Sequence, residues 1–326
     1  MPQQVAVTGG AGFIGSHLAR KLIDCENTVR IVDDFSTGSE QNLRDLKVDT
    51  EIVRGNLVDH DFALDALKNT DTVYHFAAEV GSVQYLHGSV ERELFALQTN
   101  LLIDANVFRS CIENGVRTVI YASSVSVYPK RLQMIGSSPF REEDAEKSIE
   151  PEGGYGWSKY IAEKQLELME RSNVGVARIF HAYGKNIYLA ENKSQVIGSL
   201  MRKAIRYPEE GFSVWGDGTQ KRCFVYIDDV VDALLRIHNY VEKKSSLTVN
   251  VGSQEEVTVA DLAQKIVALT GKDIPLKFDG SKPTGVLQRV PSLEKIENIL
   301  GWKPTTRFDD GLTQTYNWAV DRLQRR

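Results

Sequence analysis

The stretch TGGAGFIGSHL, residues 8–18, follows the apolar run VAV near the start of the chain and leads into an amphipathic segment. It fits two glycine patterns at once, GxGxxG at Gly10, Gly12 and Gly15, and GxxGxxG beginning at Gly9. Glycines at these spacings let a backbone approach a pyrophosphate at the N-terminus of a helix. A strand, this loop and a helix in succession predict a dinucleotide-binding α/β fold.

An acidic pair follows where the second predicted strand ends. Asp33 and Asp34 close the run TVRIVDD, and Phe35 comes next with no basic residue beside it. An acid at this position accepts hydrogen bonds from the ribose hydroxyls and repels a 2'-phosphate. The pair therefore predicts NAD rather than NADP as the cofactor. Asp33 is the expected ribose ligand, and Asp34 is either a second ligand or a turn residue.

Beyond the glycine loop, short apolar runs such as DTVYHFAA and RTVIYASS alternate with helical stretches. This alternation predicts βαβ units and a parallel sheet that is buried on both faces. After about residue 180 the pattern loosens, and one more helix and strand return to the sheet. We expect a doubly wound parallel Rossmann sheet from residues 1–180 and 224–252, and a smaller C-terminal substrate-binding lobe from 181–223 and 253–326.

The composition limits the class of protein. The 326 residues are 42% hydrophobic and 25% charged, and 39 basic and 44 acidic side chains give a net charge of -5 without a basic stripe, so nucleic acid is not an expected partner. No signal peptide or membrane span is visible. Cys25, Cys111 and Cys223 are far apart, and no metal-binding spacing joins them to the six histidines. We expect reduced thiols, a cytoplasmic location and no metal.

Residues 89–114 place apolar side chains at helical spacing and predict one long helix that ends before Gly115. Phe95, Leu102 and Ile103 lie off its main apolar stripe, so the helix is apolar on more than one side. Deep burial and a subunit interface both explain this pattern, and the sequence leaves the two open.

The segment YGWSK, residues 155–159, opens another predicted helix and places Tyr155 and Lys159 one turn apart on one face. Tyrosine is a poor base at its ordinary pKa near 10. A neighbouring ammonium and a positively charged nicotinamide ring would favour the phenolate and lower the pKa of Tyr155. The pair predicts a catalytic base and its partner; the alternative is two residues on a solvated helix face.

Several segments together resemble the extended short-chain dehydrogenase/reductase family of nucleotide-sugar epimerases and dehydratases. They are TGGAGFIGSHL, Asp33, HFAA at 75–78, Asn100, ASSVSVY from residue 122, YGWSK, VWGDGTQKRCFVYIDDVVDAL and VNVGS. The resemblance covers nearly the whole chain. Within the family, AAEVGSV at 77–83, WGDGTQKR and PTGVLQR are most similar to the GDP-mannose 3,5-epimerase branch. The resemblance implies NAD as cofactor, a nucleotide-diphosphate sugar as substrate and a homodimer built through a four-helix bundle.

The resemblance also implies roles for individual residues. Ser124 would hydrogen-bond the sugar 4-hydroxyl, Tyr155 would be the base, and Lys159 would assist it and hold the nicotinamide ribose. The expected cofactor contacts are Gly9, Gly12, Phe13, Ile14, Gly15, Asp33, Asp34, Asn56, Leu57, Ala77, Ala78, Asn100, Tyr155 and Lys159. The expected substrate contacts are Val80, Ser124, His181, Lys193, Arg222 and Arg289.

Three positions depart from the family pattern. Asn56 stands where an Asp is common near the adenine, although its amide oxygen still accepts a hydrogen bond. His181 replaces a usual Asn near the diphosphate and is either a substrate contact or a packed strand-end histidine. Pro291 falls close to a usual Asp. Arg222 keeps the fork geometry that suits a pyrophosphate.

The two residues that follow Ser124 limit the reactions that the sequence predicts. Family 4,6-dehydratases carry an acid pair directly after the Ser/Thr, and the corresponding residues here are Val125 and Ser126. At the position of Ser126, decarboxylases usually carry a Glu and 3,5-epimerases need a Cys. All three reactions are therefore disfavoured. Inversion at C4 through a transient 4-keto sugar is the expected reaction, with Ser126 relaying a proton or holding the sugar.

Other functions stay open at this stage. One is an oxidoreductase that forms or reduces a 4-keto sugar and exchanges its cofactor. Another is a GDP-sugar epimerase of different regiochemistry, and a third is a non-catalytic dinucleotide sensor, which Tyr155 and Lys159 disfavour. A GDP- or UDP-hexose is the favoured substrate, while the base and the sugar cannot be read from the sequence.

Overall fold

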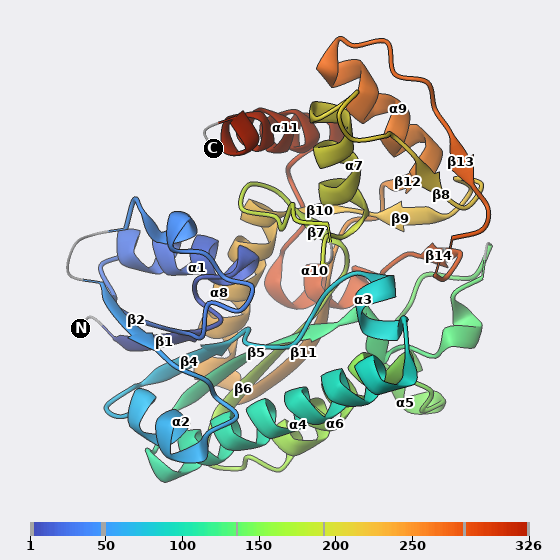
Figure 1. Cartoon of the computed structure of the whole chain (residues 1–326). Helices are drawn as coiled ribbons and strands as arrows, with labels where there is room; N and C mark the ends of the chain where they lie inside the picture. Colours follow the sequence, from blue (N-terminus) through green and yellow to red (C-terminus); the bar gives the residue numbers. More distant parts are fainter. Residues whose placement is uncertain (1–2, 47–49, 135, 192, 283–284, 325–326) are drawn as a thin grey trace.

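The computed structural model describes residues 3–46, 50–134, 136–191, 193–282 and 285–324. Its centre is a seven-stranded sheet in the order β11-β6-β5-β4-β1-β2-β3 (Figure 1), and every neighbouring pair runs parallel. The strands are β1 Gln4–Thr8, β2 Thr28–Asp33, β3 Glu51–Arg54, β4 Thr72–His75, β5 Thr118–Ser124, β6 Asn173–Ile179 and β11 Ser246–Val251. The predicted doubly wound parallel sheet is confirmed. The strand order reverses between β1 and β4, where such sheets bind ligands.

Helices cover both faces of the sheet (Figure 1). On one face lie α2 (His60–Ala66), α4 (Val90–Glu113) and α6 (Gly153–Glu167), and on the other lie α1 (Phe13–Asp24) and α8 (Ile227–Lys244). Alternate strand residues reach the two layers, since Val5 and Val7 pack in the core with α1 and α8 while Ala6 packs with α4. Burial on both faces explains why the strands are continuous apolar runs.

Helix α4 has the bounds that its sequence predicts. The Ser89 hydroxyl accepts a hydrogen bond from the Arg92 N–H at 3.2 Å, which caps the first turn. At the other end the chain turns through Gly115, whose φ of +67° favours glycine. The inner side of the helix is buried against the sheet, whereas Leu94 and Leu102 on its outer side are exposed.

A smaller lobe stands beside the carboxyl ends of the strands (Figure 1). Its helices are α7 (Val196–Ile205), α9 (Val259–Thr270) and α11 (Phe308–Gln324), and its strands pair β8 (Val214–Trp215) with β13 (Phe278–Asp279), and β9 (Lys221–Cys223) with β12 (Glu256–Thr258) and β14 (Gln288–Arg289). The remaining elements are η1 Glu40–Leu43, α3 Val83–His87, η2 Val125–Val127, η3 Lys130–Leu132, α5 Asp144–Lys147, β7 Ala182–Tyr183, β10 Val225–Tyr226 and α10 Glu294–Leu300. Within the described ranges, no helix has the length and apolar character needed to cross a membrane.

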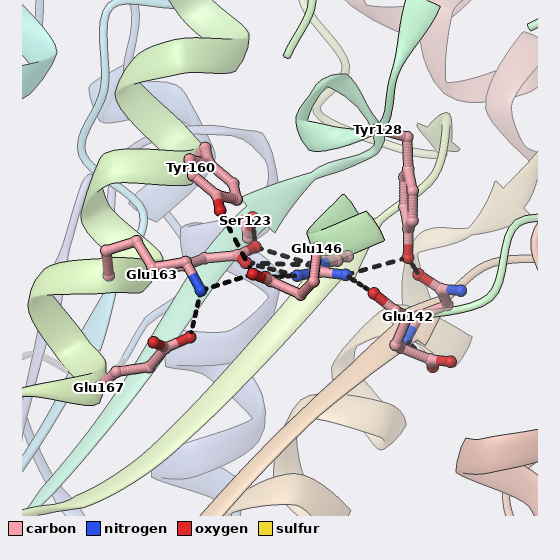
Figure 2. A network of polar contacts seen from close by, with 10 residues as sticks. Ser123, Tyr128, Glu142, Glu146, Tyr160, Glu163 and Glu167 are labelled. Carbon is pink, nitrogen blue, oxygen red and sulfur yellow. Dashed lines mark hydrogen bonds and ion pairs between the residues drawn. The ribbon is translucent and has the colours of Figure 1, made fainter. Parts of the chain in front are cut away.

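A buried polar network fixes the end of β5 and the body of α6. Arg178 of β6 donates from Nε and Nη2 to the Glu163 carboxylate, with Nη2 2.7 Å from Oε2, and from Nη1 to the Glu142 carbonyl at 2.6 Å. Ser123 also donates to Glu163, and Arg178 Nη1 donates to the Tyr128 hydroxyl at 3.3 Å, so the guanidinium links Glu163 to Tyr128, both labelled in Figure 2. The hydroxyls of Ser123 and Tyr128 are therefore engaged in holding the structure together.

We predict that Glu163→Gln lowers the free energy of unfolding by about 3 kcal/mol, because it leaves the buried Arg178 guanidinium without its closest carboxylate and with only the more distant Glu146. The double variant Glu163→Leu/Arg178→Met should cost less than Glu163→Gln alone, since it removes both charges. Urea unfolding measures both effects.

The exposed i,i+4 pair of Asp232 and Arg236 serves as the control. Asp232→Asn should cost about 0.5 kcal/mol or less, because the pair is in solvent. A double variant that costs as much as Glu163→Gln alone, or more, would contradict the prediction.

Candidate functional site

A cleft of about 2170 Å³ lies between the carboxyl ends of the strands and the smaller lobe. Its walls come from the glycine loop, the ends of β2, β4 and β5, the first turn of α6, and the lobe. Every residue predicted for the site lines this cleft, apart from Asn100. The sequence motifs are therefore brought together at the switch point of the sheet.

Two glycines make the loop before α1 possible. Gly9 has a φ of +67°, and a Cβ on it would lie 2.7 Å from the Ala77 nitrogen. A Cβ on Gly15 would lie 2.3 Å from the Gly9 carbonyl oxygen. The loop therefore packs against the start of α1 and the end of β4, and directs the N-terminus of α1 into the cleft. A helix N-terminus without side chains in front of it fits the pyrophosphate of a dinucleotide.

Asp33 is buried beside this loop. Its carboxylate accepts hydrogen bonds from the Ala11 N–H at 2.9 Å and the Phe35 N–H at 2.8 Å. Burial raises the pKa of Asp33, and the two N–H donors oppose that rise. A carboxylate has about four lone-pair directions, so Asp33 keeps acceptor capacity for the ribose hydroxyls. These residues thus fit the adenosine half of NAD.

The neighbouring polar residues turn the backbone. Asp34 accepts from the Ser36 N–H at 2.8 Å, and Asn56 Oδ1 accepts from the Val58 N–H at 2.9 Å. Both are Asx turns, the turn role that the sequence left open for Asp34. Leu57 is buried beside Asn56 in the wall of the cleft.

Asn100 lies behind the cleft and is 1% exposed. Its Oδ1 accepts from the Glu79 N–H at 2.7 Å, and its Nδ2 donates to the Glu79 carbonyl at 3.1 Å. The amide therefore fixes the loop that carries Ala77, Ala78 and Val80. Any effect of Asn100 on the cofactor passes through this backbone.

Ser124, Tyr155 and Lys159 meet on the cleft floor. Strand β5 ends at Ser124, whose hydroxyl accepts from the Ser126 N–H at 3.2 Å and hydrogen-bonds the Tyr155 side chain. Lys159 Nζ donates to the Ala122 carbonyl at 3.0 Å and lies 5.8 Å from the centroid of the Tyr155 ring. The three side chains can therefore act on one substrate hydroxyl.

Close backbone packing produces this arrangement. A Cβ on Gly156 would lie 2.4 Å from the Ser126 carbonyl oxygen, so only glycine lets α6 approach η2 so closely. The Glu152 N–H donates to the same carbonyl at 2.8 Å. Helix α6 is thereby fixed to the end of β5 at its first turn.

The pKa of Tyr155 differs from the sequence-based expectation. Burial raises it to about 12, and the hydrogen bond with Ser124 opposes the rise. Burial also lowers the pKa of Lys159, while Asp104 and Glu163 raise it. Desolvation thus outweighs the effect expected from the ammonium. Lowering the pKa of Tyr155 would therefore require a further positive charge, such as that of the nicotinamide ring of bound NAD.

Positive charge gathers on the lobe side of the cleft. Arg222 and Arg289 are register partners in the parallel strands β9 and β14. Arg222 Nη2 donates to the Val286 carbonyl at 2.7 Å, and burial and Arg289 lower its pKa to about 10. Paired guanidinium groups in a partly desolvated cleft form a site for an anion such as a diphosphate.

His181 lies beside this pair. Its ring centroid is 6.0 Å from that of Phe224, and burial together with the two arginines lowers its pKa. Among the residues that the structure describes, its buried Nε2 has no hydrogen-bond partner. His181 thus packs against Phe224 and also lines the cleft, so both roles considered from the sequence remain open.

Lys193 reaches across the cleft from the lobe. Its Nζ donates to Thr37 Oγ1 at 3.0 Å and lies 3.4 Å from a Glu79 carboxylate oxygen. These contacts join the lobe to the loops that follow β2 and β4. A substrate contact of Lys193 would have to coexist with or replace them.

Two acidic residues of the cleft that contact predicted site residues were missed by reasoning from the sequence. Glu152, at the start of α6, pairs with Arg289, and Glu79 accepts from the Tyr85 hydroxyl. Glu152 lies three residues before YGWSK, a visible signal, whereas the family pattern concerns acids directly after Ser124. Glu79 lies in AAEVGSV, a segment that supported the family resemblance, but no role was predicted for this residue.

The fold and this cleft define a Rossmann-type enzyme of the extended short-chain dehydrogenase/reductase class. The model of the NAD dependent epimerase/dehydratase family matches residues 5–252, so the chain belongs to that family, as predicted. NAD is its cofactor. Members of this family are enzymes that act on nucleotide sugars.

Relatives with different reactions match nearly the whole chain. GDP-mannose 3,5-epimerase 1 of Oryza sativa subsp. indica is 27% identical over 99% of this chain and 83% of its own length. The UDP-N-acetyl-alpha-D-glucosaminuronate decarboxylase of Bacillus cytotoxicus is 29% identical over 98% of each chain.

Solved structures of UDP-sugar proteins share the fold. UDP-glucose 4-epimerase of Thermotoga maritima, solved with UDP-glucose, has a TM-score of 0.85 and 26% identity over 98% of this chain and 99% of that one. MoeE5, solved with UDP-glucose and NAD, has a TM-score of 0.80 and 28% identity over the same shares. The comparisons support a nucleotide-sugar enzyme without selecting one reaction.

We predict that His181→Asn flattens the loss of stability at acidic pH. Below pH 6.5 the unfolded chain binds a proton at residue 181 that the buried ring does not bind, so stability falls as the pH falls. Each such proton contributes about 1.4 kcal/mol per pH unit. Urea unfolding between pH 6.5 and 5 should show a slope smaller by about one proton in the variant.

Other buried histidines keep part of the slope, because burial also lowers the pKa of His75 and His238. Phe224→Leu, which changes the packing around the His181 ring without removing a titrating group, should leave the slope as it is. An unchanged slope in His181→Asn would contradict the prediction.

Proposed function

We propose that the chain is an NAD-dependent nucleotide-sugar epimerase that inverts C4 of an NDP-hexose through a transient 4-keto sugar. The observation that supports this most strongly is the group of Ser124, Tyr155 and Lys159 on the cleft floor beside the glycine loop. Val125 and Ser126 occupy the positions where an acid or a cysteine would add dehydration, decarboxylation or 3,5-epimerisation. The remaining groups suffice for reversible oxidation of one hydroxyl.

The cofactor fits the residues at the switch point. Gly9, Gly15 and Asp33 would hold the pyrophosphate and the ribose, for the steric and hydrogen-bonding reasons given above. When bound, NAD supplies an acceptor for the C4 hydride and a donor for its return, so the net reaction consumes no cofactor.

Each protein group has a defined task in this reaction. Ser124 holds the C4 oxygen, and the phenolate of Tyr155 takes the proton of the 4-hydroxyl as C4 becomes a ketone. Tyr155 returns that proton to the oxygen when the ketone is reduced. The planar ketone presents either face after turning in the cleft, and this turning inverts C4. Lys159 stabilises the phenolate through its charge.

The arginine pair would anchor the substrate while the sugar turns. Arg222 and Arg289 present guanidinium groups side by side, and a diphosphate is the part of an NDP-hexose that does not change during inversion. His181 adds a ring with a buried nitrogen beside them. Anchoring the diphosphate leaves the hexose free to rotate above Ser124.

Products and cofactor balance test the proposal. The purified protein is incubated with GDP-, UDP-, CDP- and dTDP-hexoses without added NAD, and the sugars are identified by NMR. A C4 epimer with no accumulation of NADH is expected. Product that appears only in step with added NAD or NADH indicates an oxidoreductase, and inversion at another carbon contradicts the assignment to C4.

We predict that Tyr155→Phe lowers turnover at least about 100-fold, because the general base is lost. NAD should remain bound, since the glycine loop and Asp33 are unchanged. The measurements are the rate of product formation by NMR and the NAD released on denaturation. Tyr160→Phe is the matched control, because the Tyr160 hydroxyl donates to Glu146, outside the cleft. Full activity of Tyr155→Phe would refute the mechanism.

The proposal includes a homodimer through α4 and α6, which pack side by side (Figure 1). Their outer surface exposes large apolar side chains, namely Val90, Leu94, Leu102 and Trp157. Several exposed large apolar side chains on one helix pair are typical of an interface, and two copies of the pair would form a four-helix bundle.

We predict that Leu102→Glu converts the dimer to a monomer, because two buried carboxylates would face each other near the two-fold axis. Sedimentation velocity at micromolar concentration measures the change. Ile52→Glu, at an equally exposed position on β3, should leave the dimer intact. A wild-type chain that sediments as a monomer would disprove the interface.

A further inference from the structure

A second buried polar network lies beneath Lys159. At its centre is Asp104 of α4, which is 1% exposed. Asp104 Oδ1 lies 3.0 Å from His75 Nε2, and its Oδ2 accepts from the Tyr121 hydroxyl at 3.2 Å. His75 Nδ1 in turn lies 2.6 Å from Thr8 Oγ1. The network links the ends of β1 and β4 to α4 and β5.

The donors and acceptors of this network favour one pattern of protons. The Ala77 N–H donates to Thr8 Oγ1 at 3.4 Å, so the Thr8 hydroxyl proton is available to His75 Nδ1. The remaining ring nitrogen of a neutral His75 then donates to Asp104. Burial lowers the pKa of His75, which favours this neutral form. Within the described ranges, the two side chains that donate to the Asp104 carboxylate, His75 and Tyr121, are therefore neutral.

The Lys159 ammonium is the cation near the Asp104 carboxylate. Its Nζ lies 4.5 Å from the centroid of the Tyr121 ring, and the hydroxyl of the same ring donates to Asp104. The Tyr121 side chain therefore contacts the Lys159 ammonium through its ring and the Asp104 carboxylate through its hydroxyl. The titratable groups that act on Lys159 from its own and neighbouring elements are Tyr155 and Glu163 on α6, Asp104 on α4, Tyr121 on β5 and His75 on β4.

Glu163 does not fill the same role, because its charge is already matched. Arg178 binds its carboxylate through two nitrogens, with Nη2 2.7 Å from Oε2. Of the two carboxylates that act on Lys159, Asp104 alone has hydrogen-bond partners that are all neutral in the part of the chain that the structure describes. Opposite charges near each other in a protein interior avoid two uncompensated charges.

We propose that Asp104 is a positioning residue whose buried negative charge keeps the Lys159 ammonium protonated beside Tyr155. The contribution of this pair to turnover rests on the proposed function, whereas the charge state of Lys159 does not. Without the carboxylate, a fully buried amine would release its proton more readily, and a neutral amine cannot stabilise a phenolate.

Removing the charge should shift the pH dependence in one direction. Asp104 raises the pKa of Lys159 and also that of Tyr155. Lys159 must be protonated and Tyr155 deprotonated for catalysis, so they set the alkaline and the acidic limbs of the rate profile respectively. In Asp104→Asn both limbs should move to lower pH. A residue with only a structural role would lower the rate without moving the limbs.

A direct test measures the titration of Lys159 in the full chain. The 15N NMR signal of its amine is assigned by its loss in Lys159→Met and is followed with pH. Asp104→Asn keeps the size of the side chain, and the amide can pair with both His75 and Tyr121 after a change of tautomer. The acidity constant of the Lys159 ammonium should rise about tenfold or more in this variant. An unchanged titration would overturn the proposal.

Two controls separate charge from packing. Tyr121→Phe removes a hydrogen bond to Asp104 but keeps the carboxylate, so the titration of Lys159 should stay close to that of the wild type. Asp229→Asn removes another buried carboxylate, which accepts from the Thr305 and Thr306 backbone in a different part of the fold. It should leave Lys159 unchanged. A shift of equal size in either control would assign the effect to loss of stability and would refute the proposal.

The wild-type protein provides a measurement that needs no variant. The ring 15N shifts of His75 should show a neutral imidazole at pH 7. An imidazolium at pH 7 would mean that the positive charge of His75 already compensates the charge of Asp104, and the proposal would fail. This measurement decides the question even if Asp104→Asn does not fold. If the chain proves not to be an epimerase, the titration of Lys159 still decides the role of Asp104; if it is an epimerase and the titration is unchanged, this inference alone fails.

Discussion

The contact between α6 and the end of β5 is the constraint on which the site depends. Because Gly156 lies against the Ser126 carbonyl, the first turn of α6 comes within hydrogen-bonding reach of η2. Lys159, one turn further along, then reaches the Ala122 carbonyl at 3.0 Å. A larger residue at position 156 would move Tyr155 and Lys159 together away from Ser124. The catalytic group is thus a property of one helix packed on one strand end.

Two buried carboxylates support this contact from opposite sides. Glu163 joins α6 to β6 through Arg178, and it also fixes Ser123 on β5. Asp104 joins α4 to β4 and β5 through His75 and Tyr121. Charges in a protein interior are costly unless they are matched, and here each carboxylate has a cation close by. The same groups therefore hold the fold together and set the charge around Lys159.

The sequence predicted the fold well because local signals and tertiary packing agree. TGGAGFIGSHL contains glycines that the structure requires at Gly9 and Gly15, and the apolar runs become strands that are buried on both faces. The helix over residues 89–114 was equally clear, because its cap and its period of apolar residues point to the same element. The motifs around Tyr155 predicted which side chains would share one cleft.

Other features could not be read from the sequence. The position of Asp104 beneath Lys159 arises only when α4, β4 and β5 meet, and no local spacing joins residues 75, 104 and 121. The pKa of Tyr155 depends on how deeply the ring is buried, which a motif does not state. Glu152 lines the cleft because the first turn of α6 packs on η2, where the Glu152 N–H donates to the Ser126 carbonyl. This packing brings an acid from outside β5 close to Ser124 and Ser126.

Glu152 also bears on how relatives with one fold differ in reaction. An acid in the cleft is not by itself an acid catalyst, because its proton affinity depends on its partners. Glu152 pairs with Arg289, which itself also donates to Gln133 Oε1 at 2.7 Å. This pairing places a carboxylate on one side of the Arg289 guanidinium. An anionic diphosphate at Arg289 would meet that carboxylate, so Gln133 and Glu152 define the direction from which the arginine is approached. The chemistry open to the cleft is therefore set by how its acids are paired, as well as by which residues follow Ser124.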